Sequence, residues 1–181
     1  VTVPLRPDLF HLTRDAHTIM RRLERAAYKA METAERARRA KRERQAPQRR
    51  PGRPLQVDVS VTEATEAEEG AIDTYDAGYW LWREARRALE PINERGQVTT
   101  TQAARETVEA AMELLQELER EDLTEFAQDM LDRLDDLVAP LTWLEECVAP
   151  WRQEVDAETD PIIMWAWQHR HALDLEPGAG F

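Results

Sequence analysis

Residues 45–54 read QAPQRRPGRP, and this short segment limits the folds open to the chain more than any other feature. Three prolines and one glycine within ten residues exclude a helix interior, because proline lacks the backbone N–H and glycine loses the most conformational freedom. Long stretches rich in helix-forming residues lie on both sides of it. The segment therefore predicts an exposed turn between two long helices, which can pair as an antiparallel hairpin.

The first long helix is predicted from Asp8 to about Arg44. Its apolar residues recur every three or four positions, which is the spacing of one helix face. Beyond Leu23 that face is nearly all alanine, which is typical of a slender helix packed closely on one partner. The residues of this face are Ile19, Leu23, Ala27 (or Ala26), Ala30, Ala34 and Ala37.

The second long helix is predicted from near Thr62 to Leu89, with Pro91 stopping it. In the hairpin, Leu12 and Met20 of the first helix are expected near an aromatic cluster of the second. Val57, Val59 and Val61 precede the helix in alternation with polar residues, as a short strand or, as we expect, an extended lead-in. The aromatic cluster is Tyr79, Trp80 and Trp82, and the apolar face is Ile72, Tyr75, Tyr79, Trp82 and Leu89.

Four shorter helices are predicted downstream. Thr99 with Gln102 resembles a capping box that opens a helix ending near Glu119, and Asp122 with Glu125 opens the next in the same way. Pro140 is expected to end that helix, and Pro150 to end a short one that starts at Thr142. Pro161 then opens the last. The fold class expected is all-α, a long antiparallel hairpin packed with a bundle of about four shorter helices, six helices in all.

Charge divides the chain into two parts. Residues 1–54 hold fifteen Lys and Arg against six Asp and Glu, a balance of +9, whereas residues 55–181 hold nine against thirty, a balance of −21. We therefore expect a basic helical arm, 1–54, and an acidic helical bundle, 55–181, that form one structural unit. Either the basic arm meets nucleic acid, or the arm and the bundle attract one another or present two solvated faces.

Several combinations of residues bear on chemistry, and none completes a catalytic site. His11 and Asp15 have the spacing of a two-ligand metal site on a helix. The alternative is that both residues have a surface or packing role. The adjacent pairs Asp135–Asp136 and Glu145–Glu146 diverge on a helix and predict a solvated face. His169 and His171 are expected to be solvent groups near a helix end. Four tryptophans are expected mainly in the core, namely Trp143, Trp151, Trp165 and Trp167.

The turn itself carries the Gly-Arg-Pro core of an AT-hook, whose extended backbone lays arginines into the narrow minor groove of A·T-rich DNA. Its predicted DNA-binding residues are Arg49, Arg50, Gly52 and Arg53. A fuller AT-hook has arginine where Pro51 stands, and short runs of Arg, Pro and Gly also arise by chance.

The opening Pro7-Asp8-Leu9-Phe10-His11, followed by Arg14-Asp15 and a long helix, resembles the segment around the second catalytic aspartate of a group of bacterial RNase-H-like (DDE) transposases. The later Leu141–Glu145 segment, LTWLE, with Ala149–Arg152, APWR, resembles the helical insertion of the same group. The resemblance implies that Asp8 is a catalytic, metal-binding carboxylate and that the intact enzyme uses Mg²⁺. On the residues alone, Asp8 also fits the N-cap of the first helix.

The resemblance also implies that the first catalytic aspartate would precede Val1 and the last acid would follow Phe181. We therefore expect a transposase fragment or helical insertion region. Alone, the chain is expected to be inactive and to hold no cofactor. Its basic arm is expected to contact DNA, the remainder of a transposase, or a second copy. The alternative is a stand-alone helical protein–protein interaction module. The single Cys147 and the absence of a long apolar run predict a cytoplasmic protein with no membrane partner.

Overall fold

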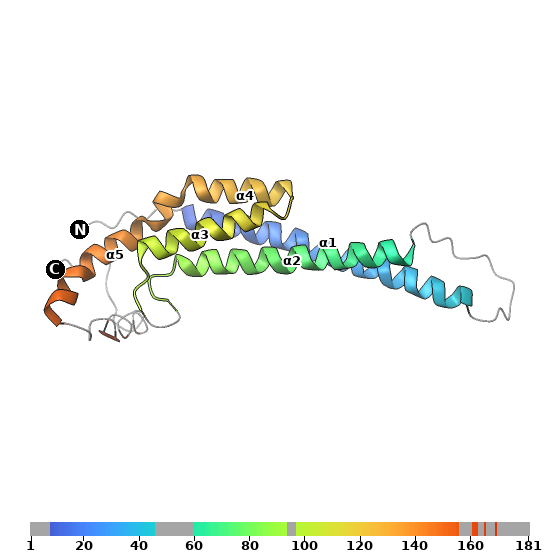
Figure 1. The fold of residues 1–181 in the computed structure, drawn as a ribbon, viewed down its shortest axis with the longest axis horizontal. Coiled ribbons are helices and arrows are strands. Elements are labelled where there is room, and N and C mark those ends of the chain that lie inside the picture. Colours follow the sequence, from blue (N-terminus) through green and yellow to red (C-terminus); the bar gives the residue numbers. More distant parts are fainter. Residues whose placement is uncertain are drawn as a thin grey trace.

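The computed structural model describes residues 8–45, 60–93 and 97–155, together with residues 161, 162, 165 and 169. Within these residues the chain is all-α, as predicted (Figure 1). A lone antiparallel β-bridge joins Ile92 and Val98 between the second and third helices. The helices are α1 (Asp8–Gln45), α2 (Val61–Ala88), α3 (Thr101–Gln116), α4 (Glu121–Asp132) and α5 (Leu134–Val155).

Helices α1 and α2 form the predicted antiparallel hairpin. Their 38 and 28 residues correspond to about 57 Å and 42 Å at 1.5 Å per residue. The two helices are in contact at Gly78, where a Cβ would lie 3.4 Å from Leu23 Cδ1 and 3.7 Å from Met20 Cε, so that a methyl group fits but a larger side chain does not. Toward the end of α1 and the start of α2, Ala34, Ala37 and Ala64 form a second, smaller buried cluster, and half-buried Val61 packs against it.

The start of α2 is fixed by a complete capping box at Ser60. The Ser60 hydroxyl accepts a hydrogen bond from the Glu63 N–H at 3.1 Å, and the Glu63 carboxylate accepts one from the Ser60 N–H at 3.1 Å. The predicted start near Thr62 is thus confirmed to within a residue, and Val61 is already helical. Val57 and Val59 lie outside the described residues.

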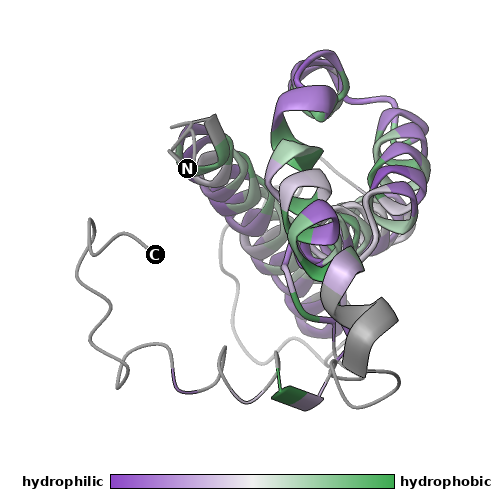
Figure 2. Ribbon diagram, turned by 90° about the vertical axis from the view of Figure 1, so that its left-hand side faces the viewer, coloured by the Kyte–Doolittle hydropathy of each residue, from purple (hydrophilic) through white to green (hydrophobic). Residues whose placement is uncertain are grey.

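The main core lies at one end of the hairpin, where α3 packs on α2, α4 packs on α1 and α3, and α5 packs chiefly on α3. Trp82 meets Phe126 edge to face, with ring centroids 5.5 Å apart. We call this part the body, and from here on we use the arm for residues 27–45 of α1 with 60–74 of α2, in place of the segment 1–54 defined by charge; this arm extends away from the body (Figure 1). Viewed end-on, polar residues colour much of the outer surface of the helices (Figure 2). The largest fully buried side chains are Leu12, Leu23, Val108, Met112, Leu115, Leu123, Met130 and Leu141.

The aromatic prediction is confirmed only in part. Leu12, Met20 and Trp82 share the main core. Tyr79 and Trp80, however, are 47% and 53% exposed. The expectation of a mainly buried tryptophan set also fails at Trp143 and Trp165, which are 37% and 54% exposed.

Helix α3 is capped one residue later than predicted. Thr100, not Thr99, is the N-cap, and its hydroxyl accepts from the Ala103 N–H at 3.2 Å. The Thr99 side chain is buried and donates to the Glu90 carbonyl oxygen at 2.6 Å, which ties the loop to the end of α2. The predicted end near Glu119 is also late, since α3 ends at Gln116 and Glu119 has a left-handed φ of 53°.

The prediction that Pro140 and Pro150 end helices is wrong. The helix ends earlier, at Asp132, and after Arg133 the next helix, α5, continues through both prolines. Both are exposed, so water can hydrate the carbonyl groups that lose their N–H partners. Buried Leu137, Val138, Leu141 and Val148 hold the helix on the body on either side of Pro140.

Five helices, not six, are defined within the described ranges, and the predicted sixth falls largely outside them. Only residues 161, 162 and 165 of that region are described as helical. No helix among the described residues is long and apolar enough to cross a membrane.

Candidate nucleic-acid interface

A line of exposed cations follows the outer side of α1, where the body gives way to the arm. Arg22, Arg25 and Lys29 are spaced by three and four residues, so they project from the same side of the helix. That side is roughly opposite the buried Leu23 and Ala27, which face α2. We call the three cations the basic stripe. Its two ends are about 10 Å apart along the helix axis, the distance that about three phosphates cover along one DNA strand.

No carboxylate of the described chain forms an ion pair with any residue of the basic stripe. Three of the cations nearer the tip differ. Arg36 pairs with Glu32 at 2.6 Å, Arg42 with Glu35 at 2.6 Å and Arg39 with Glu43 at 3.1 Å. The positive charge of the basic stripe is therefore not neutralised by an ion pair, unlike the charge of these three arginines.

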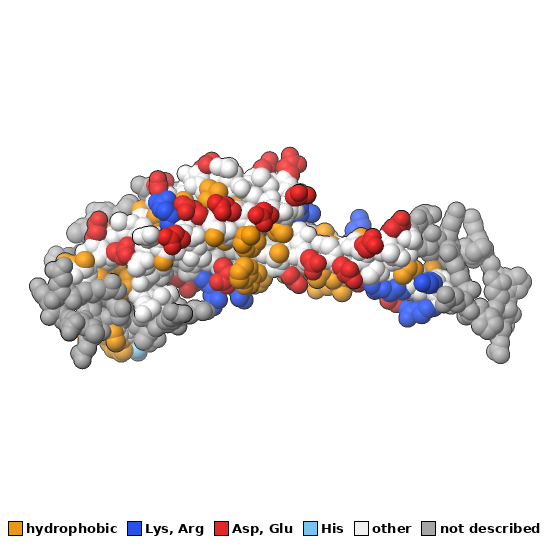
Figure 3. Space-filling model, in the orientation of Figure 1, with side chains coloured by type: hydrophobic (Ala, Val, Ile, Leu, Met, Phe, Trp, Pro, Cys, Tyr) orange, Lys and Arg blue, Asp and Glu red, His pale blue; other side chains and the backbone are white. Residues whose placement is uncertain are grey.

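One cation of the arm is used inside the hairpin. The Arg38 guanidinium donates to the Glu68 carboxylate and to Thr65 Oγ1, and both acceptors belong to α2. At this point the basic and acidic parts of the chain attract one another, which was one of the predicted meanings of the charge division. In the face shown in Figure 3, basic side chains gather near the outer end of the arm and acidic ones cover much of the body.

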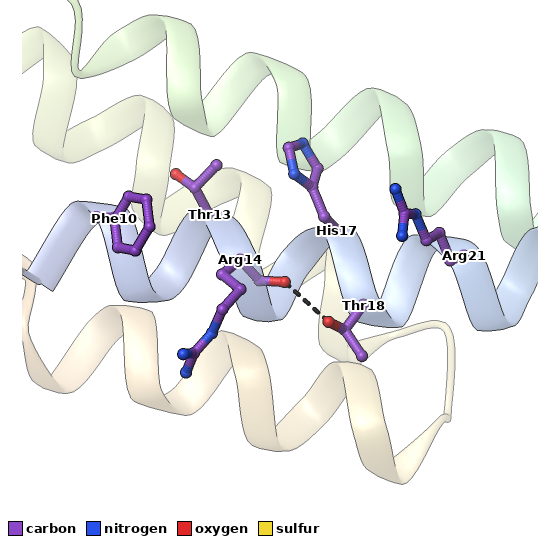
Figure 4. A pocket seen from close by; sticks show the side chains of 6 residues that line it. All are labelled: Phe10, Thr13, Arg14, His17, Thr18 and Arg21. Carbon is purple, nitrogen blue, oxygen red and sulfur yellow. Dashed lines mark hydrogen bonds between the residues drawn. The ribbon is translucent and has the colours of Figure 1, made fainter.

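A shallow depression of about 390 Å³ lies on α1 beyond the body end of the basic stripe (Figure 4). Phe10 is 72% exposed there. The Thr18 hydroxyl donates to the Arg14 carbonyl oxygen at 3.0 Å. An exposed aromatic ring and two guanidinium groups suit an anionic or planar ligand group. The depression is lined by Phe10, Thr13, Arg14, His17, Thr18 and Arg21.

Asp8, the carboxylate singled out by the transposase resemblance, is the first residue of α1. Its backbone thus lies at the amino-terminal end of a helix, and its side chain falls outside what the structure describes. The predicted catalytic and metal-binding role of Asp8 stays a prediction. The alternative, that the Asp8 side chain is the N-cap of α1, also stays a prediction. An N-cap residue comes directly before the first helical residue, and here Asp8 is itself that first residue.

The His11 and Asp15 pair has no third ligand in the described part of the chain. His11 is exposed, and Asp15 accepts from the neighbouring Arg14 Nε at 3.3 Å. Across residues 8–45, 60–93 and 97–155, no three His, Cys, Asp or Glu side chains lie close enough to hold a metal ion. On α1, His11 and Asp15 are surface residues.

The adjacent carboxylates do not all lie on a solvated face. Glu145 is half-buried and accepts from both the Thr101 N–H, at 3.0 Å, and the Thr101 hydroxyl, at 2.6 Å. Its contact places a negative charge at the positive end of α3. The prediction of a solvated pair is therefore wrong for Glu145, whereas Glu146 is exposed as expected.

The other predicted site residues and perturbed groups add no further chemistry. The AT-hook-like residues Arg49, Arg50, Gly52 and Arg53 lie outside the described residues. His169 is exposed, and its Nδ1 lies 2.8 Å from the Trp165 carbonyl oxygen. The imidazole ring of His169 also stacks on the indole ring of Trp165. Burial, together with the Glu24 carboxylate, raises the pKa of Tyr75.

The basic stripe and the depression were not singled out from the sequence, although Arg22, Arg25 and Lys29 show the spacing. That signal is weak because α1 carries many cations, and only their positions show which ones are paired. Comparison with protein-family models, with curated proteins and with solved structures found no match for this chain.

Proposed function

We propose that the chain is the helical insertion region of an RNase-H-like transposase and that it binds DNA along the basic stripe of α1. The observation that carries the DNA contact is the row of exposed cations at Arg22, Arg25 and Lys29, without ion pairs to other described residues. DNA is the polyanion that such a row suits, because each phosphate contact releases bound counterions. The acidic surface of the body would keep the duplex on the outer side of α1.

The transposase part of the proposal rests on the residues that carry the resemblance. Asp8 would supply one carboxylate of a two-metal site, and the remainder of the enzyme would supply the other ligands for Mg²⁺. In this arrangement α1 runs directly from the catalytic region into the arm. A helix of about 57 Å could thus carry the basic stripe and the Arg49–Arg53 turn to DNA well away from the reacting phosphodiester.

The test is a binding titration with a fluorescent A·T-rich duplex at low salt. We expect Arg25→Gln to weaken binding severalfold, and the triple variant Arg22→Gln, Arg25→Gln, Lys29→Gln to weaken it by more than tenfold. Arg86→Gln is the matched control, because Arg86 is also an exposed helical arginine but lies on α2. Equal losses at Arg25 and Arg86 would show that only net charge matters, which contradicts a defined interface.

The AT-hook-like turn makes a separate contribution in this proposal. Replacing Arg49, Arg50 and Arg53 by alanine should weaken binding to A·T-rich duplex more than to G·C-rich duplex, since a narrow minor groove is what these arginines would enter. If the A·T preference of the wild-type chain is absent, or survives the substitutions unchanged, the turn has no such role.

A second candidate function is a stand-alone protein–protein interaction module, and one observation favours it. Trp80 and Leu114 are large apolar side chains that are about half exposed, at 53% and 46%, on neighbouring helices. The alanine variants of the turn separate the two candidates, because a module that uses Trp80 and Leu114 keeps its partner when Arg49, Arg50 and Arg53 are removed.

A further inference from the structure

An open groove of about 360 Å³ runs between α2 and α3 on the body. From α2 it is lined by Trp80, Leu81 and Glu84, and from α3 chiefly by Thr107, Ala110 and Leu114. Leu81 is 5% exposed and belongs to the main core, so the floor of the groove is rigid. Trp80 and Leu114 stand above that floor with much of their apolar surface in water.

The small residues of α3 give the groove the shape of a helix-binding surface. Thr107, Ala110 and Leu114 follow one another at spacings of three and four residues and are all exposed. They therefore form one stripe on α3, beside the edge of α2 that carries Trp80. In Figure 3 a hydrophobic patch lies near the middle of the molecule, over α2 and α3, with acidic side chains around it.

The charges around the groove are negative. Glu84 and Glu106 line it directly, and Asp76 and Glu113 are exposed within about one helical turn of Trp80 and Ala110. The nearby cations Arg83 and Arg87 both lie 3.6 Å from the Glu84 carboxylate, which balances the charge of one of them, and the charges of Asp76, Glu106 and Glu113 outweigh the one that remains. A ligand for this surface must therefore combine apolar side chains with positive charge.

We infer that the groove between α2 and α3 binds a cationic amphipathic helix from a partner protein. Its apolar side chains, spaced by three, four and seven residues, would pack between Trp80 and Leu114, and its flanking lysines or arginines would meet Glu106 and Glu113. A second copy of this chain fits less well, because it would bring another surface of a chain with net charge −12 against this one. The inference does not depend on DNA binding by α1.

The test uses the full chain and a fluorescein-labelled peptide of about fourteen residues, made of leucine and lysine with all leucines on one helical face. Fluorescence anisotropy should show binding in the micromolar range. A scrambled peptide of the same composition, with leucines all around the helix, and a peptide with glutamate in place of lysine should both bind at least tenfold more weakly. Equal binding of the scrambled peptide would overturn the inference, because attraction by charge alone would then explain it.

Single substitutions in the chain test whether the peptide binds in the groove. Trp80→Ala and Leu114→Gln change exposed side chains, so the fold should survive, and each should weaken binding at least tenfold. Trp143→Ala is the matched control, since Trp143 is also exposed but lies on α5. Equal binding to the Trp80 and Trp143 variants would overturn the inference. A dimer in sedimentation that Leu114→Gln abolishes would also overturn it, in favour of a second copy.

The same titration separates this inference from the DNA proposal. The Arg22, Arg25 and Lys29 variant described above should bind the leucine–lysine peptide as tightly as the wild type does, or slightly more tightly because it is more acidic. A large loss of peptide binding in that variant would place the peptide elsewhere and contradict the groove.

Discussion

At the scale of single residues, Glu145, within the Leu141–Glu145 segment LTWLE, has a structural role. Its carboxylate accepts two hydrogen bonds from Thr101, the first residue of α3. Thr142 lies on the same side, with its hydroxyl oxygen 3.1 Å from that of Thr101. The segment therefore anchors α5 to the start of α3, whichever function the whole chain has.

Glu145→Ala should lower the free energy of unfolding by about 1–3 kcal/mol, because two charge-assisted hydrogen bonds and a favourable helix-end charge are lost together. Urea denaturation followed by circular dichroism measures this. Glu146→Ala is the control, since Glu146 is exposed and its replacement should change stability by less than about 0.5 kcal/mol. Similar effects at the two positions would mean that the Glu145 contact contributes little.

Asp122 makes a prediction about pH. The Arg120 guanidinium donates to both carboxylate oxygens, at 3.0 and 3.1 Å, and holds the pKa of Asp122 below its ordinary value of 3.8. Because the folded-state pKa is lowered, the contribution of Asp122 to stability is present above about pH 5 and is lost as the pH falls through the folded-state pKa.

We therefore expect the melting temperature of Asp122→Asn to lie below that of the wild type at pH 6.5, with a smaller difference at pH 3. Glu121→Gln, an exposed neighbour in the same first turn of α4, should differ little from the wild type at either pH. An Asp122→Asn difference that is equal at both pH values would contradict the pKa argument.

At the scale of helices, the two long elements were predictable because their apolar periodicity is sustained over many turns. Ile19, Leu23, Ala27, Ala34 and Ala37 are buried as the spacing predicted, whereas Ala30 of the same predicted face is only half-buried. The α4–α5 region was not predictable in the same way. Its apolar residues continue evenly across the break at Arg133, whereas Pro140 and Pro150, the obvious stop signals, lie within α5.

The candidate site shows a different limit. The spacing of Arg22, Arg25 and Lys29 is visible in the sequence, but the pairing of Arg36, Arg39 and Arg42 with glutamates is a matter of side-chain position. The spacing of Val108, Ala111 and Leu115 predicts that Leu115, and not Leu114, is buried, and the structure confirms this. The groove was not predicted, because the contact of exposed Leu114 with the Trp80 side of α2 depends on how α2 and α3 are placed.

The two glycines of α2 give a prediction for the helix pairing. Gly70 has nothing near its missing Cβ, so Gly70→Ala should raise the free energy of unfolding by about 0.5–1 kcal/mol. Gly78 faces Leu23 and Met20, so Gly78→Leu should lower it by about 1–3 kcal/mol by forcing the helices apart.

Urea denaturation of both leucine variants checks this contact. Gly70→Leu is the matched control for Gly78→Leu, since it adds the same side chain to the same helix in open space. If both leucine variants are equally stable, the close approach of α1 and α2 at Gly78 is wrong.

At the scale of the whole molecule, the body and the arm differ in how much apolar surface holds them together. The body buries Leu, Met, Phe and Trp side chains from all five helices, whereas the buried side chains of the arm are all alanines, namely Ala27, Ala34, Ala37, Ala40 and Ala64. Small side chains let the helices approach closely but remove little apolar area from water. The arm should therefore open locally while the body stays folded.

Hydrogen exchange measured by mass spectrometry tests this difference. Backbone amides around Ala34, Ala37 and Ala64 should exchange at least about tenfold faster than those around Leu115 and Leu123, which corresponds to about 1.4 kcal/mol of opening free energy. Uniform protection along α1 would show that the arm is as stable as the body. Added DNA should slow exchange in the arm if the duplex lies along α1.

The central claim is that the outer face of α1 contacts the DNA backbone, and the salt dependence of binding tests it most directly. We would measure the slope of log K against log salt concentration for the wild type, for Arg86→Gln, and for the variant with glutamine at positions 22, 25 and 29. Each lost phosphate contact removes about 0.9 from the magnitude of the slope. The triple variant should therefore lose about 2.7, with Arg86→Gln unchanged, whereas an unaltered slope in the triple variant would contradict the claim.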